Sequence, residues 1–313
     1  HLPSLSRVLF GSPASAQGIS SFQAFSLAVS GRVGTGNIAG VAGAIAAGGP
    51  GAVFWMWLIA FVGSGSAYVE AALAQIYKKK VDGQYRGGPA YYIEKGMKTK
   101  VYASVFAVAT IIGCGLCLPT VQSNSIGEAM ANAFAIPTWV SGVVVALGIG
   151  LIIVGGIKRI GLAVQMIVPV MAVGYMLVAL VVIAMNITEI PAAFGLIFRS
   201  AFGMEATYGG IVGSAIAFGV KRGIYSNEAG QGTAPMAAAA AEVEHPAQQG
   251  LVQAFSIYFD TWMVCTATAL MIISTGSYNV LDGAGGFLRE QLPGITDGPA
   301  YTQVAVDSVI PNF

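Results

Sequence analysis

The chain has 313 residues, of which 55% are hydrophobic and only 9% are charged, against roughly 25% charged residues in ordinary soluble domains. This composition predicts an all-α integral membrane protein and excludes an ordinary soluble domain. The formal net charge of +1 says little, because the placement of Lys and Arg orients a membrane protein. Three separated cysteines do not make a disulfide framework and are expected to be packing residues.

Apolar stretches long enough to cross a bilayer recur along the chain. We predict seven spans, at approximately residues 20–47, 52–77, 101–131, 139–155, 160–185, 197–220 and 251–275. Residues 1–20 are then a cytoplasmic lead-in and residues 20–275 the transmembrane domain. Residues 276–313 form an external loop with the start of an eighth helix.

Residues 30–51 contain the most unusual part of the first span. Its middle, Gly34, Thr35, Gly36 and Asn37, weakens a helix and offers polar groups. An unpaired backbone group costs several kcal/mol at membrane depth, so such a break is tolerated only where it lines a cavity or holds a ligand. The sequence therefore predicts a discontinuous helix and a binding site here. The alternative is that the small residues only allow close helix packing.

A broken helix offers groups of both signs to a ligand. The N–H groups that begin its second half suit a carboxylate, and the C=O groups that end its first half suit a cation. Thr35 and Gly36 are therefore candidate substrate-binding residues. Ser30, Val33 and Asn37 are candidate sodium ligands, although oxygen ligands do not separate Na⁺ from other hard cations.

A second weak point lies in the sixth span, at Gly209, Gly210, Gly213 and Ser214. Breaks at corresponding places in two halves are typical of secondary transporters built from inverted repeats. Because the first and sixth spans are five apart, a five-plus-five repeat is predicted, and these four residues are expected to face the first break and bind substrate.

Arg32, Glu70 and Asp260 are charged residues inside the predicted spans. Intramembrane charges are costly and mark functional or paired positions. Arg32 either contacts a substrate carboxylate or forms an ion pair, with Glu205, Glu70 or Asp260 as its partner. Glu70 and Asp260 are themselves candidates for gating, for ion pairing or for carrying a proton.

The basic residues indicate an orientation. Most of the 15 Lys and Arg lie in alternate connectors: Arg7, the group between residues 78 and 100, Lys158, Arg159, Lys221 and Arg222. The opposite connectors hold only Arg199 and Arg289. By the positive-inside rule, the lead-in and the basic loops face the cytoplasm of a plasma (inner) membrane.

Four strings carry a family resemblance, at residues 32–40, 48–57, 87–96 and 219–230. In this order, and with membrane spans between them, they resemble the alanine or glycine:cation symporter family. The resemblance implies a LeuT-type fold of the amino acid–polyamine–cation superfamily. Seven of its core helices are present here, with helices one and six discontinuous. A family member carries about three further helices after residue 275.

The same resemblance implies a substrate site and an activity. Gln122 and Asn124 of the third span resemble the family's glutamine-and-asparagine segment near the substrate. The implied activity is sodium-coupled import of alanine or glycine by alternating access. The alternatives are proton coupling through Asp260 or Glu70, or a truncated membrane protein that binds the amino acid without transporting it.

An enzyme is not expected, because the only histidines, His1 and His245, lie outside the spans. We expect no organic cofactor and no nucleic-acid partner. The expected partners are a small neutral amino acid, Na⁺ as the coupling ion and the lipid bilayer.

Overall fold

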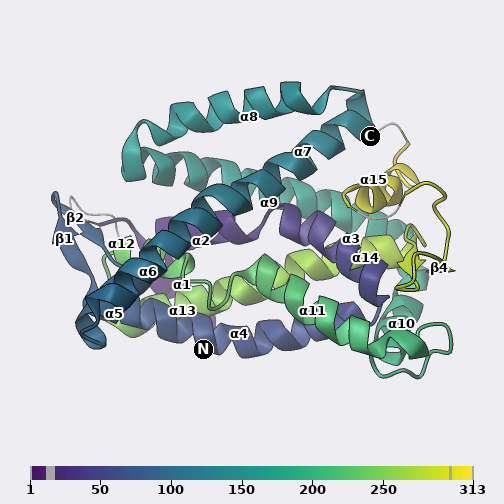
Figure 1. Cartoon of the computed structure of the whole chain (residues 1–313), viewed down its shortest axis with the longest axis horizontal. Helices are drawn as coiled ribbons and strands as arrows, with labels where there is room; N and C mark the ends of the chain where they lie inside the picture. Colours follow the sequence, from purple (N-terminus) through teal and green to yellow (C-terminus); the bar gives the residue numbers. More distant parts are fainter. Residues whose placement is uncertain (1, 12–17, 296–297, 312–313) are drawn as a thin grey trace.

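The computed structural model describes residues 2–11, 18–295 and 298–311, which are mostly helical (Figure 1). Within these ranges four helices are long and apolar enough to cross a membrane: Ala52–Tyr77, Lys100–Phe134, Arg159–Met185 and Pro246–Ser274. Two shorter apolar helices, Gly36–Gly48 and Thr138–Ile153, accompany them.

The first predicted span is interrupted. After α1 (Leu2–Phe10), helix α2 (Ser21–Arg32) begins with a capping box in which Ser20 and Gln23 bond reciprocally. The chain leaves helical geometry at Val33, whose φ is −77° and ψ 101°. It resumes as the π-helix η1 (Gly36–Gly40) and continues as α3 (Val41–Gly48).

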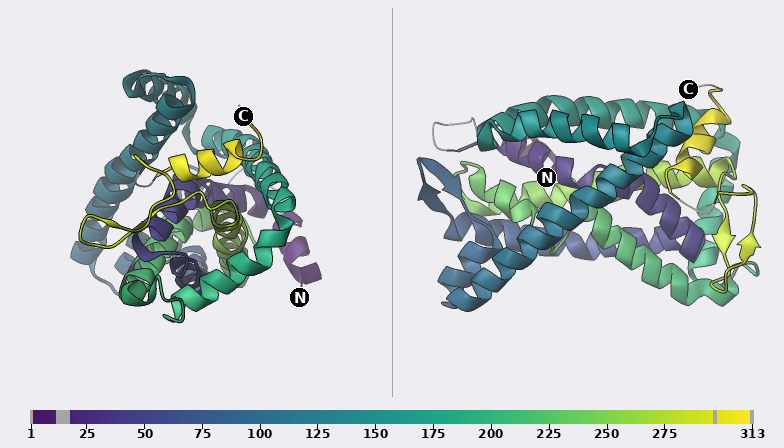
Figure 2. Two further views of the ribbon diagram at one scale, coloured as in Figure 1. Left: turned by 90° about the vertical axis from the view of Figure 1, so that its right-hand side faces the viewer. Right: turned by 45° about the horizontal axis from the view of Figure 1, so that its top comes forward.

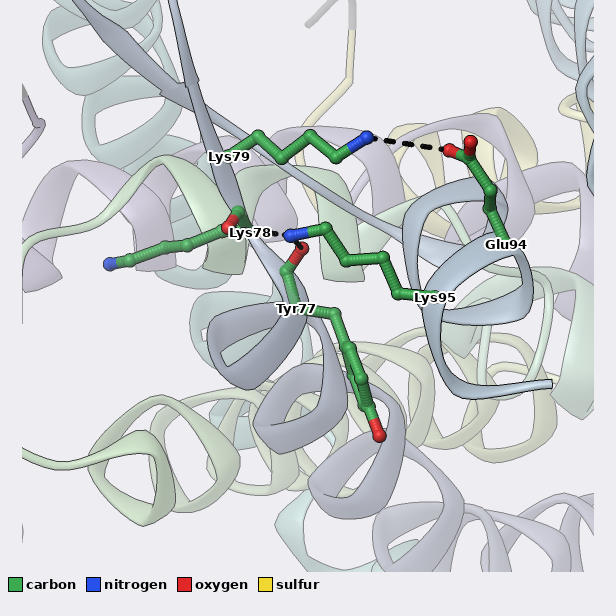
Figure 3. Close-up of polar contacts among 5 residues, drawn as sticks. All are labelled: Tyr77, Lys78, Lys79, Glu94 and Lys95. Carbon is green, nitrogen blue, oxygen red and sulfur yellow. Dashed lines mark hydrogen bonds and ion pairs between the residues drawn. The ribbon is translucent and has the colours of Figure 1, made fainter. Parts of the chain in front are cut away.

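The second span is α4 (Ala52–Tyr77), with the predicted bounds. The antiparallel hairpin of β1 (Lys79–Val81) and β2 (Gln84–Arg86) follows, and then α5 (Pro89–Gly96). Figure 3 shows α5 fastened to the end of α4: Lys95 Nζ donates to the carbonyls of Tyr77 at 3.0 Å and Lys78 at 3.4 Å. A cation here complements the negative end of the α4 dipole. Beside it, Lys79 and Glu94 form an exposed ion pair.

The third span is one continuous helix made of α6 (Lys100–Thr110), the π-helix η2 (Ile111–Cys117) and α7 (Leu118–Phe134). It crosses the molecule diagonally in Figure 1 and lies at one edge of it in the left view of Figure 2. Only 6% of its most apolar 18-residue stretch is buried, so most of its apolar side chains face outward. The fourth and fifth spans are α8 (Thr138–Ile153) and α9 (Gly156–Met185).

The sixth span differs from the prediction. The 3₁₀ turn η3 (Ile187–Glu189) leads into α10 (Ile190–Ala201), which ends where the span should be under way. Gly203, with φ at 70°, reverses the chain in a conformation that favours glycine. The 3₁₀ turn η4 (Gly209–Ile211) then opens α11 (Val212–Asn227). A single span over residues 197–220 is therefore wrong, and Lys221 and Arg222 lie within α11 rather than in a connector.

The last elements complete the bundle. After α12 (Ala234–Ala240), the seventh span is one helix of α13 (Pro246–Ile257), the π-helix η5 (Tyr258–Cys265) and α14 (Thr266–Ser274). Within residues 276–313, predicted as a loop, the described part holds a hairpin of β3 (Val280–Leu281) and β4 (Phe287–Arg289), and then α15 (Ala300–Asp307).

Helix α4 is the packing centre of the molecule, with α11 and α13 beside it (Figure 1). The approach of α11 is possible only because it presents glycines. A Cβ at Gly219 would lie 2.4 Å from the carbonyl oxygen of Ala52, and one at Gly223 would lie 2.4 Å from Ile59 Cγ2. Backbone contact of this kind is typical of membrane helix interfaces.

Candidate binding site between two helix interruptions

Asn37 closes the first interruption. Its side-chain Oδ1 accepts from the Gly34 N–H at 2.8 Å, and its own N–H donates to the Gly34 carbonyl at 3.1 Å. These two bonds replace part of the missing helical turn. Of the other predicted sodium ligands, the Ser30 hydroxyl is turned back onto the Leu27 carbonyl at 2.7 Å. The Val33 N–H makes the last bond of α2, to the Val29 carbonyl.

A second interruption lies at residues 228–233, between α11 and α12. Glu228 adopts a left-handed conformation with φ at 53°, and Gly230 and Gly232 have φ values of 79° and 83°. This segment faces the first interruption. Arg32 Nε donates to the carbonyl of Asn227 at 2.7 Å, and a Cβ at Gly31 would lie 3.1 Å from Glu228 Oε2.

The predicted glycine-rich partner of the first break is elsewhere. Gly209, Gly210 and Gly213 are exposed. Ser214 lies beside Gly48 at the far end of α3, where a Cβ at Gly48 would be 3.1 Å from its carbonyl oxygen. Gly36 and Gly48 are about 18 Å apart along a helix. The predicted meeting of residues 209–214 with the first break is therefore wrong, because this turn begins α11 instead of interrupting it.

Of the two amides in the third span, only Gln122 reaches the break. Its Oε1 accepts from the Thr35 N–H at 3.1 Å and from Thr35 Oγ1 at 2.6 Å. Asn124 donates instead to Glu128 at 2.8 Å and lines a groove of about 660 Å³ between α7 and α8. Residues two apart in a helix do not share a face, so of the two predicted substrate ligands only Gln122 lies at the break.

Asp260 is the centre of a buried polar cluster. It is 0% exposed and accepts from Asn37 Nδ2 at 2.7 Å, from Ser226 Oγ at 2.9 Å and from Thr261 Oγ1 at 2.9 Å. These groups come from η1, α11 and η5, so the carboxylate joins both halves of the site to the seventh span.

Arg32 is 1% exposed and holds the two interruptions to α13. Besides Asn227, its guanidinium bonds to Ser256 and to Gln253. Across residues 2–11, 18–295 and 298–311 no carboxylate lies within 4.0 Å of it. The predicted ion pair is thus not formed: Glu205 pairs with Arg199 at 3.2 Å, Glu70 accepts from the Gly230 N–H at 3.0 Å, and Asp260 is used as described above.

Sequence reasoning missed Ser226, Asn227 and Glu228. They belong to the string at residues 219–230, which carried the family resemblance but was otherwise interpreted as a polar connector. Asn-Glu-Ala-Gly-Gln-Gly at residues 227–232 combines helix-weakening and polar residues as the first break does, and this is the sequence signal that marks it as a candidate interruption beside residues 209–214.

Apolar helices around two facing interruptions are consistent with an all-α membrane protein, and the buried polar cluster between the interruptions is its candidate binding site. Comparison with known proteins specifies the class. Residues 1–312 match the sodium:alanine symporter family, and the chain belongs to that family.

Three relatives illustrate the similarity. The chain is 59% identical over 313 residues to a putative sodium/proton-dependent alanine carrier protein of Bacillus subtilis, covering 100% of this chain and 65% of the relative. It is 44% identical over 303 residues to a sodium/alanine symporter of Methanococcus maripaludis, covering 94% and 64%. It is 46% identical over 295 residues to a probable sodium/glutamine symporter of Bacillus subtilis, covering 94% and 59%. The chain thus spans less than two thirds of these relatives.

Proposed function

We propose that this protein couples the entry of Na⁺ to the import of a small neutral amino acid, alanine in the first place. The observation that carries the proposal is the meeting of the two interruptions, residues 33–35 and 228–233, beside the buried carboxylate of Asp260. Family membership supports the same activity, since one relative is named a putative sodium/proton-dependent alanine carrier protein and another a sodium/alanine symporter.

The substrate lies at the first interruption in this proposal. Its carboxylate accepts from the N–H groups that open η1, near Gly36, and from the hydroxyl of Thr35. Gln122 turns its amide to complete the contact. The ammonium group of the substrate faces the carbonyls that end α2, where the negative end of the helix dipole favours a cation.

Sodium lies beside the substrate, among the oxygen atoms of Asp260, Ser226, Thr261 and Asn37, with the carbonyls of Ser30 and Val33 on the α2 side. Such hard oxygen donors suit Na⁺. To ligate the ion, Asn37 must turn Oδ1 away from the Gly34 N–H, which it now caps at 2.8 Å. The freed N–H then becomes a donor for the substrate carboxylate. Each ligand thereby prepares the site of the other, which is the linkage that symport requires.

The proposed fold is a LeuT-type five-plus-five repeat, with α2 and α3 as core helix one and α11 and α12 as core helix six. Residues 228–233, rather than 209–214, are then its second discontinuity. The basic hairpin faces the cytoplasm, because Arg199 of α10 and Arg289 of β4 lie at the opposite end of the molecule (Figure 1). Inward movement of one Na⁺ at 100 mV supplies about 2.3 kcal/mol for uphill uptake.

The test is uptake of labelled alanine into proteoliposomes, with Na⁺ replaced by choline at constant pH. Sodium coupling predicts loss of uptake in choline. Thr35→Ala and Asn37→Ala should weaken the affinities for alanine and Na⁺ together, and unchanged affinities for both would refute the site. Binding of alanine in calorimetry without uptake would identify a non-transporting protein.

A second candidate is proton coupling, favoured by the charge balance of the interior. Glu70, Glu228 and Asp260 are at most 9% exposed, and Arg32 is the buried cation among them. Their excess negative charge calls for a further cation, and a proton on Glu70 or Asp260 would serve. Uptake driven by an imposed pH gradient in choline, without Na⁺, would support this reading and contradict sodium coupling.

A further inference from the structure

The connector between α4 and α6, residues 78–100, carries an excess of positive charge. It contains seven basic residues and only two acidic ones. Both carboxylates are in exposed ion pairs, Asp82 with Arg86 at 3.8 Å and Glu94 with Lys79 at 3.5 Å. The connector therefore holds no further carboxylate that could balance its other cations.

Three exposed lysines carry the unbalanced charge. They are Lys80 of β1, and Lys98 and Lys100 where α6 begins. In residues 2–11, 18–295 and 298–311 no carboxylate lies within 4.0 Å of any of the three. Figure 1 shows the hairpin, α5 and the start of α6 together at one end of the molecule. The three lysines thus make that end a cationic surface.

An apolar stripe continues from this surface along α6 and η2. Val101, Val105, Val108 and Ile112 follow Lys100 at the spacing of one helix face. These four side chains are between 51% and 76% exposed. Apolar groups exposed in this way on a helix long enough to cross a membrane suit contact with lipid hydrocarbon.

Tyrosines mark the level of the membrane surface on the same connector. Tyrosine and tryptophan are enriched where a bilayer meets water. The connector and the helix ends beside it contain five tyrosines: Tyr77, Tyr85, Tyr91, Tyr92 and Tyr102. Lys79 Nζ lies 5.8 Å from the centre of the Tyr91 ring. Lysines at this level reach the lipid headgroups, and the apolar stripe lies deeper.

We propose that Lys80, Lys98 and Lys100 bind the phosphate groups of phospholipids that carry a net negative charge, while acyl chains of these lipids lie along the stripe that begins at Val101. A lysine ammonium donates to phosphate oxygens and is attracted by their charge. The three lysines belong to neither helix interruption, so the inference does not depend on the proposed transport activity.

Two features of the surface select an acidic phospholipid. The unpaired lysines favour an anion, and a zwitterionic headgroup is attracted less because its own ammonium offsets its phosphate. The apolar stripe favours a ligand with hydrocarbon chains, which inorganic phosphate and glycerol phosphate lack. A lipid carrying both a net negative headgroup and acyl chains satisfies both features.

The test follows the thermal transition of the full chain in a nonionic detergent while phosphatidylglycerol is added, because a ligand of the folded state raises this transition according to its affinity. Phosphatidylcholine with the same acyl chains should bind about tenfold less tightly. Raising NaCl to about 0.5 M should reduce this difference, because salt screens exposed charges.

A triple variant, Lys80→Gln with Lys98→Gln and Lys100→Gln, should bind phosphatidylglycerol about 100-fold more weakly, since each lysine near the headgroups contributes about fivefold. All three side chains are exposed, so the variant should fold. The matched control replaces the same lysines by arginine, which keeps the charge and should keep the affinity.

Three results would overturn the proposal. They are equal stabilisation by phosphatidylcholine and phosphatidylglycerol, unchanged binding of phosphatidylglycerol by the glutamine variant, and stabilisation by glycerol phosphate as strong as that by the lipid. The last result would identify a site for free phosphate in place of a lipid surface. Selective stabilisation by phosphatidylglycerol that is lost in the glutamine variant and kept in the arginine variant would support the proposal.

Discussion

Substituting Asp260 by Asn tests the sodium site most directly. The change keeps the size of the side chain and removes its charge. In the structure the carboxylate accepts from three donors, at 2.7, 2.9 and 2.9 Å, and is fully buried. The amide retains one acceptor oxygen, and its NH₂ group meets hydroxyls that must rotate to accept from it.

The magnitude follows from these contacts. A hydrogen bond to a charged group contributes about 1.5–3 kcal/mol and a neutral one about 1 kcal/mol. Asp260→Asn turns two of the three charge-assisted hydrogen bonds into neutral ones and removes the attraction of the carboxylate for the cation. Together these changes should cost about 2 kcal/mol of Na⁺ binding free energy, or about 30-fold in Na⁺ affinity.

The assay is the Na⁺ concentration that gives half-maximal alanine uptake, measured with the protein shown to be folded by its thermal transition. Asp282→Asn is the matched control, because Asp282 lies in the exposed β3–β4 turn and its carboxylate accepts from the N–H groups of Ala284 and Gly286 in the same turn. A half-maximal Na⁺ concentration within twofold of the unsubstituted protein would refute the placement of sodium at Asp260.

Three further predictions concern the site and its frame. Gln122→Leu removes the acceptor of both Thr35 donors and should raise the alanine KM about tenfold in uptake assays, whereas Asn124→Leu should change it less than twofold. Gly219→Val adds a side chain where a Cβ alone would lie 2.4 Å from the carbonyl oxygen of Ala52, and it should abolish the folded peak in size-exclusion chromatography. Lys95→Met removes an exposed cation that caps the end of α4 and should lower stability by less than about 1 kcal/mol in thermal melts.

The first interruption could be predicted from the sequence because its cause is local. Two glycines, a threonine and an asparagine within four residues weaken any helix, and the apolar flanks fix the depth. The second could not be separated from a false candidate on the same grounds. Residues 209–214 are richer in glycine than residues 227–232, but glycine content alone does not distinguish the turn before a helix from a break within one.

The hydrogen-bond partners of the buried side chains were harder still to predict from the sequence. An ion pair was predicted for Arg32 with one of three carboxylates of the spans, Glu205, Glu70 or Asp260, yet its guanidinium bonds to a carbonyl, a hydroxyl and an amide. Those groups come from α11 and α13, some 200 residues away in the chain, and only the folded packing brings them together. Gln122 and Asn124 were predicted together, although residues two apart in a helix do not share a face, and this periodicity would have separated them.

The glycine contacts between α4 and α11 have a mechanical consequence. At Gly219 and Gly223 backbone meets side-chain stem or backbone directly, with no flexible side chain between the helices to absorb sliding. We therefore expect α4 and α11 to move as one rigid unit, and the chain to bend at residues 33–35 and 228–233. Both segments lie at the proposed ligand site, so in the proposed transport cycle the bound amino acid would move little while the helices on either side of it rotate.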